Sequence, residues 1–368
     1  MSARFRAPRG CLVAPAAISF SVKPSAYGAT PPERLLASTL IAGFTALLSG
    51  EAGGRIIARA PTVGAFGRGV GVSAPDVAVG GGQQGLPGRF ALRGQDYACR
   101  VLGAGPALLA LHGFTGTGAT WLPLAAALGS SRRVLAPDLL GHGDSGASRD
   151  PARYQLGEQT ADLAALLDAL SEDAVDLLGY SRGGRLALAF ALAYPARVRR
   201  LLLESTSAGL DDEAERAARR TQDEGWAELL ETAGLAAFVR EWERLPLWAS
   251  QARLPPTLRA ALRAQRSVHD PRALAACLRG SGQGVQPHDW LRLSTLGVPV
   301  TVIVGALDDK YVALARRLQA GLRQAELNLV AEAGHAVHLE QPLAFAARVA
   351  AALDRPLAGA PTAAGEGR

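Results

Sequence analysis

Short apolar runs alternate with Ala- and Leu-rich helical patterns through most of the chain. The apolar runs cover residues 107–111, 133–136, 175–178, 201–203, 298–304 and 327–330. The helical patterns cover residues 161–170, 185–193, 313–322 and 342–353. Uniformly apolar strands that alternate with helices predict βαβ units, in which a mostly parallel sheet is covered by helices on both faces. Residues 90–101 predict two more short strands around a Gly turn, so the fold class is α/β.

One long segment, residues 210–294, interrupts this alternation. It contains no strand-like run, its helical patterns are separated by prolines, and it holds four of the five tryptophans, Trp226, Trp242, Trp248 and Trp290. An aromatic-rich helical insertion between two strands predicts a cap over a site, with a purely structural excursion as the alternative. We therefore expect a core formed by residues 89–209 and 295–354, a helical cap at 210–294, and a disordered tail at 355–368.

The net charge of +6 is concentrated in an N-terminal extension, residues 1–88. Residues 1–95 hold ten Lys/Arg against three Asp/Glu, whereas residues 96–368 hold 29 against 30. A neutral body argues against a nucleic-acid partner, which requires a basic face. The extension is rich in Ala, Gly, Ser, Pro and Arg, so we expect it to be disordered or to serve as a targeting segment.

Cysteine content and hydropathy indicate the cellular compartment in which such a chain is expected. Three scattered cysteines exclude a disulfide framework and a zinc site and suit a reducing compartment. The longest apolar stretch, residues 35–48, is shorter than the ~20 residues that cross a bilayer. We expect a cytoplasmic protein without stable membrane insertion, or a plastid protein if the extension is a transit peptide.

The sequence GYSRG at residues 179–183 follows an apolar run and opens a helical pattern. A serine at such a strand-to-helix reversal needs a strained backbone, and glycines two residues before and after it remove side-chain clashes. The hydroxyl of Ser181 is then presented above the carboxyl edge of the sheet. We interpret Ser181 as the reactive group.

A reactive serine needs a base and a carboxylate that orients the base. His335 follows the last apolar run, and Asp308 follows the run at 298–304. Spacing alone leaves Asp309 as an alternative to Asp308. His338 is interpreted as structural, and His112 and His142 as loop histidines. The order Ser181, Asp308, His335 is the order expected of α/β-hydrolases.

Two main-chain amides are candidates for an oxyanion site. Phe114 lies in the HGF sequence after the run at 107–111, and Arg182 follows the serine. Their N–H groups are expected to converge on a developing negative oxygen.

The chain from about residue 89 to 354 resembles the α/β-hydrolase superfamily. Within it, the chain is similar to the family of 2-succinyl-6-hydroxy-2,4-cyclohexadiene-1-carboxylate synthases of menaquinone and phylloquinone biosynthesis. The resemblance rests on HGFTG at 112–116, DLLGHG at 138–143, GYSRGGR at 179–185, ESTSAGL at 204–210, RAAR at 216–219, LRGSGQGVQP at 278–287, GALDDKY at 305–311 and AGH at 333–335.

That resemblance implies a lyase that eliminates pyruvate from a cyclohexene bearing several carboxylates, with no metal or organic cofactor. The triad would act as a general base, and the substrate would be held by Tyr180, Arg185, Arg219, Trp242 and Arg266. Arg263 competes with Arg266 for its role, and Arg266 is preferred for its distance upstream of Gln286. Arginine suits such a substrate because it pairs with carboxylates in a bidentate manner.

One residue departs from the family pattern, in which an apolar Met or Leu usually follows the serine. Here that residue is Arg182, whose cation either helps to bind a carboxylate or disturbs the pocket. Two other functions stay open on this scaffold, an esterase or carbon–carbon bond hydrolase and a non-catalytic receptor for a small ligand. The expected partner is a small polycarboxylate, and the expected assembly is a monomer or homodimer.

Overall fold

The computed structural model describes residues 87–357. The predictions for the extension at 1–88 and the tail at 355–368 fall almost entirely outside these residues. The fold described below is therefore that of the predicted core and cap.

Eight strands form one sheet, in the order β1-β2-β4-β3-β5-β6-β7-β8. They are β1 (Gly88–Leu92), β2 (Gln95–Gly103), β3 (Ala107–Leu111), β4 (Arg133–Pro137), β5 (Val175–Tyr180), β6 (Val198–Glu204), β7 (Val300–Gly305) and β8 (Ala325–Val330). β2 pairs antiparallel with both of its neighbours, β1 and β4, and every other pairing is parallel. The mostly parallel α/β sheet predicted from the alternation of patterns is confirmed.

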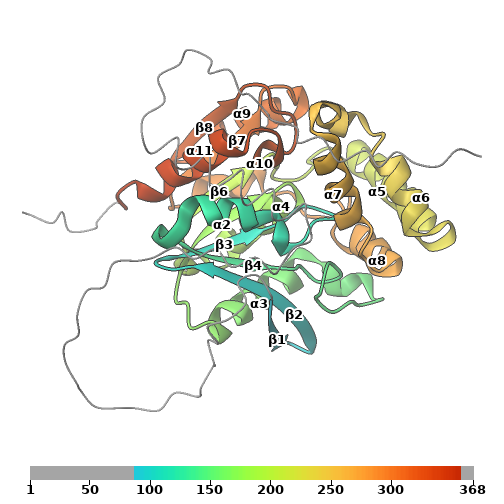
Figure 1. The fold of residues 1–368 in the computed structure, drawn as a ribbon, viewed down its shortest axis with the longest axis horizontal. Coiled ribbons are helices and arrows are strands. Elements are labelled where there is room, and N and C mark those ends of the chain that lie inside the picture. Colours follow the sequence, from blue (N-terminus) through green and yellow to red (C-terminus); the bar gives the residue numbers. More distant parts are fainter. Residues whose placement is uncertain (1–86, 358–368) are drawn as a thin grey trace, which may run out of the picture.

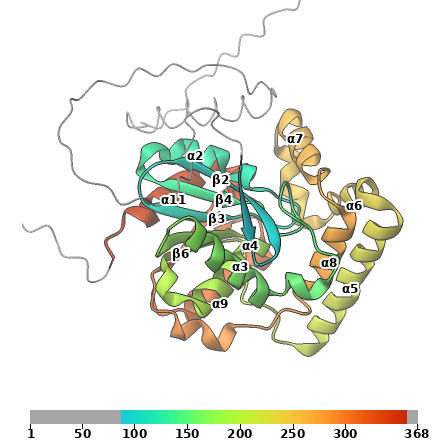
Figure 2. The same cartoon turned by 90° about the horizontal axis from the view of Figure 1, so that it is seen from below.

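Helices cover both faces of the sheet (Figures 1 and 2). α2 (Leu122–Leu128) and α11 (Pro342–Asp354) pack on one face, and α3 (Leu156–Ala169), α4 (Arg182–Ala193) and α9 (Asp309–Gly321) pack on the other. β3, β5 and β7 are buried along their whole length. Burial on both faces explains why these strands read as continuous apolar runs rather than as alternating patterns.

The remaining regular elements are short. They are the helix α10 (Val337–Glu340) and six 3₁₀ segments, η1 (Gly118–Trp121), η2 (Gly129–Ser131), η3 (Pro151–Tyr154), η4 (Pro195–Arg197), η5 (Pro246–Arg253) and η6 (Trp290–Thr295).

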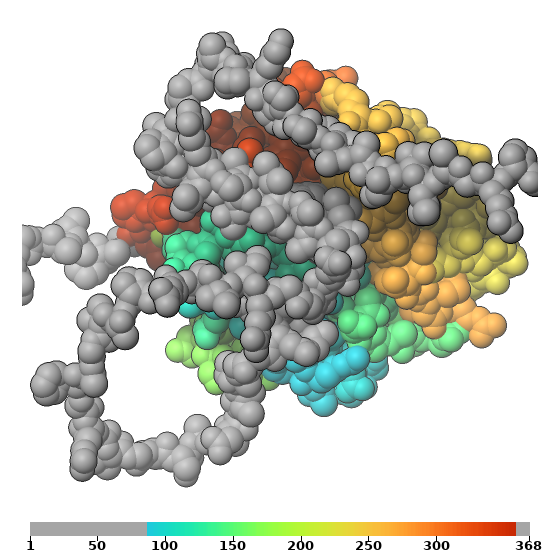
Figure 3. Space-filling model, in the orientation of Figure 1, coloured from blue at the N-terminus to red at the C-terminus, as the bar shows by residue number. Residues whose placement is uncertain are grey.

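Four helices between β6 and β7 gather at one side of the sheet (Figure 1). They are α5 (Glu213–Thr232), α6 (Gly234–Trp242), α7 (Pro256–Arg266) and α8 (Pro271–Ser281). Three of them, α5, α6 and α8, share an apolar cluster that includes Phe238, Trp242 and Leu274. In the space-filling view their atoms, yellow to orange, adjoin those of the core (Figure 3). We call these four helices the cap helices.

Within residues 87–357, no helix combines the length and apolar character needed to cross a bilayer. The apolar stretch at 35–48 lies outside the described residues. Cys99 and Cys277, the two cysteines that the structure describes, are buried and free.

Candidate active site

Ser181 occupies a strained reversal between β5 and α4. Its φ of 52° and ψ of −112° lie where side-chain-bearing residues are rarely found. A Cβ atom on Gly179 would lie 2.4 Å from the carbonyl oxygen of Gly183, and one on Gly183 would lie 2.4 Å from that of Leu111. Both glycines are therefore required by close backbone approach, as the spacing of the motif indicated.

The structure brings Ser181, His335 and Asp308 together. The Oγ atom of Ser181 lies 3.0 Å from Nε2 of His335, and Nδ1 of the same ring lies 2.8 Å from Oδ2 of Asp308. The imidazole is 1% exposed and the carboxylate 9%. A base held between a hydroxyl and a buried carboxylate can accept the hydroxyl proton and stabilise the resulting imidazolium.

The neighbouring candidates have other contacts. Asp309 is exposed and starts α9, so the carboxylate that contacts the imidazole is that of Asp308. His338 is buried, and its Nδ1 lies 2.8 Å from the carboxylate of Glu204. This contact suits the structural role expected for His338.

Aromatic rings surround the imidazole of His335. The ring centroids of Tyr311, Tyr180 and Trp248 lie 4.4, 5.5 and 5.5 Å away. Burial raises the pKa of both tyrosines, so their hydroxyls stay protonated and available as donors. Sequence reasoning missed Tyr311 and Trp248. The GALDDKY match at 305–311 was the available signal for Tyr311.

The two expected oxyanion amides lie at one edge of the sheet. Phe114 follows β3, Arg182 opens α4 directly after β5, and these two strands are parallel neighbours. The Arg182 amide belongs to the first turn of a helix, where N–H groups have no partner within the helix. The placement is compatible with convergence of the two donors on one oxygen atom.

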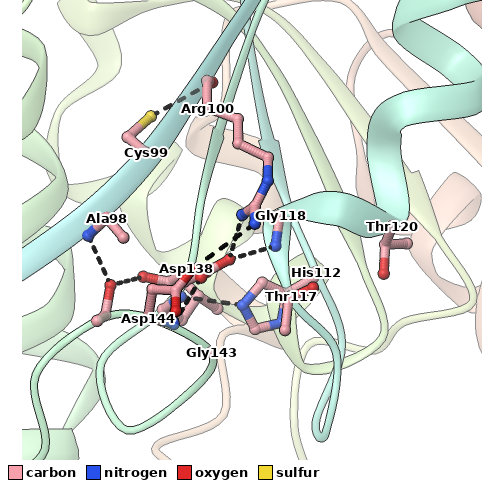
Figure 4. Close-up of polar contacts among 12 residues, drawn as sticks. Ala98, Cys99, Arg100, His112, Thr117, Gly118, Thr120, Asp138, Gly143 and Asp144 are labelled. Carbon is pink, nitrogen blue, oxygen red and sulfur yellow. Dashed lines mark hydrogen bonds and ion pairs between the residues drawn. The ribbon is translucent and has the colours of Figure 1, made fainter. Parts of the chain in front are cut away.

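A buried carboxylate anchors the loop that carries Phe114 (Figure 4). Asp138 is fully buried, and its Oδ1 accepts hydrogen bonds from the amide of Gly118 at 2.6 Å and from Arg100 at 3.1 Å. Its Oδ2 accepts a hydrogen bond from the amide of Asp144 at 2.8 Å. Nε2 of His112 accepts a hydrogen bond from the amide of Leu139 at 2.9 Å. These bonds fix the loop to the end of β4.

A cavity of about 470 Å³ lies between the cap helices and the core. The core contributes Ser181 and the segment that includes Asp308 and Tyr311. The cap contributes aromatic and polar side chains from α5, α6, η5, α8 and the loop after α8, among them Trp226, Trp242, Trp248 and Gln283. The triad thus faces a chamber that is enclosed by the segment predicted to be a cap.

Several cations line this cavity. Arg182, Arg185 and Arg219 do so together with Lys310. Arg219 pairs with Asp223 at 2.8 Å and donates to Gln283 at 3.0 Å. Burial, followed by the charges of Arg219 and Arg182, lowers the pKa of Arg185 to about 10, which still leaves its guanidinium charged at neutral pH.

Arg266 is the one predicted substrate-binding residue that does not line the cavity. Its guanidinium lies 5.2 Å from the ring centroid of Trp248, and it donates to Glu243 at 3.0 Å and to Gln251 at 3.1 Å. Arg263 is exposed and pairs with the same Glu243. In this structure Trp248 separates Arg266 from the triad, since this ring packs against both Arg266 and His335.

No group of three His, Cys, Asp or Glu side chains suited to a metal ion is found within residues 87–357.

Comparison with known proteins finds relatives in sequence and in structure. A family profile described as "alpha/beta hydrolase fold" matches residues 106–342. A Bacillus subtilis (strain 168) protein, assigned as a 2-succinyl-6-hydroxy-2,4-cyclohexadiene-1-carboxylate synthase, is 41% identical over 242 residues, which cover 66% of this chain and 88% of the relative. The structure of MenH from S. aureus is similar with a TM-score of 0.66 at 32% identity, covering 70% of this chain and 97% of the other. An enol-lactonase from Burkholderia xenovorans LB400 is similar with a TM-score of 0.64 at 25% identity, covering 73% and 100%.

Proposed function

This chain belongs to the α/β-hydrolase family and is homologous to the 2-succinyl-6-hydroxy-2,4-cyclohexadiene-1-carboxylate synthases, and on that premise we propose that it is itself such a lyase. The reaction would convert 2-succinyl-5-enolpyruvyl-6-hydroxy-3-cyclohexene-1-carboxylate into the 2,4-cyclohexadiene and pyruvate.

The chemistry that this reaction demands follows from the chemical structures of the substrate and the product. The ring hydrogen at C2 is acidified by the adjacent succinyl ketone, and its removal places negative charge on the ketone oxygen. The electron pair then forms the C2–C3 double bond, the C3–C4 pair moves to C4–C5, and the C5–O bond breaks. The enolate of pyruvate departs and is protonated. The protein must therefore supply one base, one oxyanion site and binding groups for carboxylates.

The triad supplies the base. Transfer of the Ser181 proton to His335 at 3.0 Å lets the serine oxygen accept the C2 proton, while Asp308 at 2.8 Å stabilises the imidazolium. The amides of Phe114 and Arg182 would hold the charge on the ketone oxygen. A preorganised donor of this kind is typically worth about 3–4 kcal/mol in the transition state.

The observation that carries the proposal is the charge state of the cavity. The substrate bears three carboxylates, and Arg185 is 93% buried beside Ser181 with hydrogen bonds only to the neutral acceptors Ser281 and Gln286. A buried guanidinium without a carboxylate partner is costly unless a ligand supplies the negative charge. A neutral ester would gain little from it.

Pyruvate release from the enolpyruvyl substrate tests the proposal. We expect turnover by the intact protein and a loss of several powers of ten in kcat for Ser181→Ala, with folding checked by circular dichroism. Arg348→Met, which changes an exposed residue on α11, is the matched control. Absence of pyruvate release by the folded protein would overturn the lyase assignment.

Ester or lactone hydrolysis is the second candidate, because the same hydroxyl–imidazole contact can generate an acylating nucleophile. The similar enol-lactonase favours it. Assays with p-nitrophenyl esters beside the enolpyruvyl substrate separate the two functions, since fast ester turnover without pyruvate release favours hydrolysis.

A further inference from the structure

Two buried guanidiniums share the first turn of α4, directly after Ser181. Arg182 and Arg185 are 4% and 7% exposed. Arg182 donates from Nε to the hydroxyl of Ser281 at 3.2 Å and from Nη2 to the side-chain oxygen of Gln159 at 2.8 Å. Arg185 donates from Nη1 to the carbonyl oxygen of the same Ser281 at 3.0 Å. Ser281, the last residue of α8, therefore joins the two side chains.

Neither cation has a carboxylate partner among the described residues. Nη1 of Arg182 is buried and has no hydrogen-bond partner at all within residues 87–357. Both cations also lie at a helix N-terminus, where the helix dipole disfavours positive charge. The two guanidiniums thus place two positive charges at the cavity wall that no hydrogen-bonded carboxylate neutralises, a cost that evolution tolerates at functional sites.

We propose that Arg182 is a positioning residue of the cavity that holds Arg185 through Ser281, and that its uncompensated charge makes the cavity select ligands carrying several carboxylates. Arg182 lines the cavity, but its unpartnered nitrogen is not exposed, so its charge acts on a ligand through the electrostatic field. This inference rests on the proposed function and adds the selectivity of the site for ligand charge.

The physical basis is that the electrostatic interaction with a fixed charge grows with the number of charges on the ligand. Removal of Arg182 should then weaken a tricarboxylate more than a dicarboxylate, and a dicarboxylate more than a monocarboxylate. Loss of packing would weaken all three equally. The two explanations therefore predict different patterns of affinity.

The experiment is a binding titration at constant ionic strength with acetate, succinate and tricarballylate as probes. Fluorescence of the cavity tryptophans Trp226, Trp242 and Trp248 reports occupancy without any turnover. We expect Arg182→Met to weaken tricarballylate roughly tenfold and acetate by less than about twofold. Arg182→Lys, which keeps the charge, should retain most of the wild-type preference for tricarballylate over acetate.

Two further variants complete the test. Ser281→Ala keeps both cations but removes the hydroxyl that Arg182 contacts. It should weaken succinate and tricarballylate by similar factors, both smaller than the factor for tricarballylate in Arg182→Met. Arg348→Met lowers the net charge equally from α11, away from the cap helices (Figure 1), and should leave all three affinities unchanged. Equal weakening of all probes by Arg182→Met, or none, would overturn the proposal. If Arg182→Met fails to fold, Arg182→Lys and Ser281→Ala still test the proposal, because equal weakening of all three probes by these variants would contradict it. Every variant keeps the main-chain N–H of residue 182, and the readout does not depend on pyruvate elimination.

Discussion

His269 donates a hydrogen bond from Nε2 to the main-chain carbonyl oxygen of Thr115, 2.9 Å away. Its Nδ1 accepts a hydrogen bond from the amide of Gly143 at 3.1 Å, which leaves the ring proton on Nε2. Thr115 has a φ of 62°, in the left-handed region that a β-branched residue rarely adopts. Because His269 lies between the cap helices α7 and α8 and Thr115 follows Phe114, this bond ties the cap to the candidate oxyanion loop.

We predict that His269→Ala lowers kcat about tenfold with a smaller change in KM, because a strained loop that loses its support misplaces the Phe114 amide. Steady-state pyruvate release measures the effect. Ser267→Ala is the control, since Ser267 is exposed and its hydroxyl donates to the carbonyl oxygen of Arg263 in α7. His269→Gln, which retains a donor, should recover part of kcat. An unchanged kcat for His269→Ala would show that the loop keeps its geometry without the cap.

Adjacent carboxylates at the start of α9 allow a paired test of the relay. Asp308→Asn should reduce kcat by up to about 10⁴-fold, because an amide favours the wrong imidazole tautomer and cannot stabilise the imidazolium. Asp309→Asn should reduce it far less, since Asp309 is exposed and the carboxylate that bonds to His335 is that of Asp308. Equal losses in the two variants would contradict the assignment of Asp308 as the orienting carboxylate.

His112 makes stability depend on pH. Burial is the main reason that its pKa falls to about 3, and its ring is neutral because Nε2 accepts the Leu139 amide while Nδ1 contacts the carbonyl of Gly113. Unfolding releases the ring to its ordinary pKa of 6.5. Below this value the unfolded state binds the extra proton, so stability is complete above pH 6.5 and is lost as the pH falls toward 3.

Denaturant unfolding at pH 7.5 and pH 4.5 checks this prediction. Each unit of pKa shift corresponds to about 1.4 kcal/mol, so the wild-type protein should lose a few kcal/mol between these two conditions. Burial lowers the pKa of His142 as well, so part of the dependence should persist in His112→Gln. A pH dependence as steep in His112→Gln as in the wild type would mean that other groups cause it.

Much of the fold and the triad could be predicted from sequence because local rules govern both. A serine between close-packed glycines at a strand end specifies its own geometry, and uniformly apolar runs specify buried strands. Helix α2 was not predicted, since its seven residues begin with Leu and Pro and are too short for a helical period to emerge.

The placement of cap residues could not be predicted in the same way. Arg266 lies behind Trp248 because of how α7 packs against η5 and α6, and spacing along the chain carries no information on that packing. Tyr311 was missed for a related reason. Its contact with His335 arises from the direction in which the first turn of α9 leaves the sheet edge.

The buried pair of Glu204 and His338 yields a prediction about stability rather than catalysis. Glu204 is fully buried at the end of β6, and its Oε1 accepts hydrogen bonds from both the amide and Nδ1 of His338, at 3.0 and 2.8 Å.

His338→Leu leaves this carboxylate with one hydrogen bond, from the main-chain amide, and no charged or ring partner, which should lower the free energy of unfolding by about 3–5 kcal/mol. Glu204→Leu combined with His338→Leu should recover most of that loss, because neither polar group then remains buried alone. Denaturant unfolding of the single and double variants measures the coupling. Because the ring of His338 packs 4.6 Å from that of Tyr180, kcat is measured in parallel. A catalytic His338 would instead lower kcat sharply in a variant that keeps its stability.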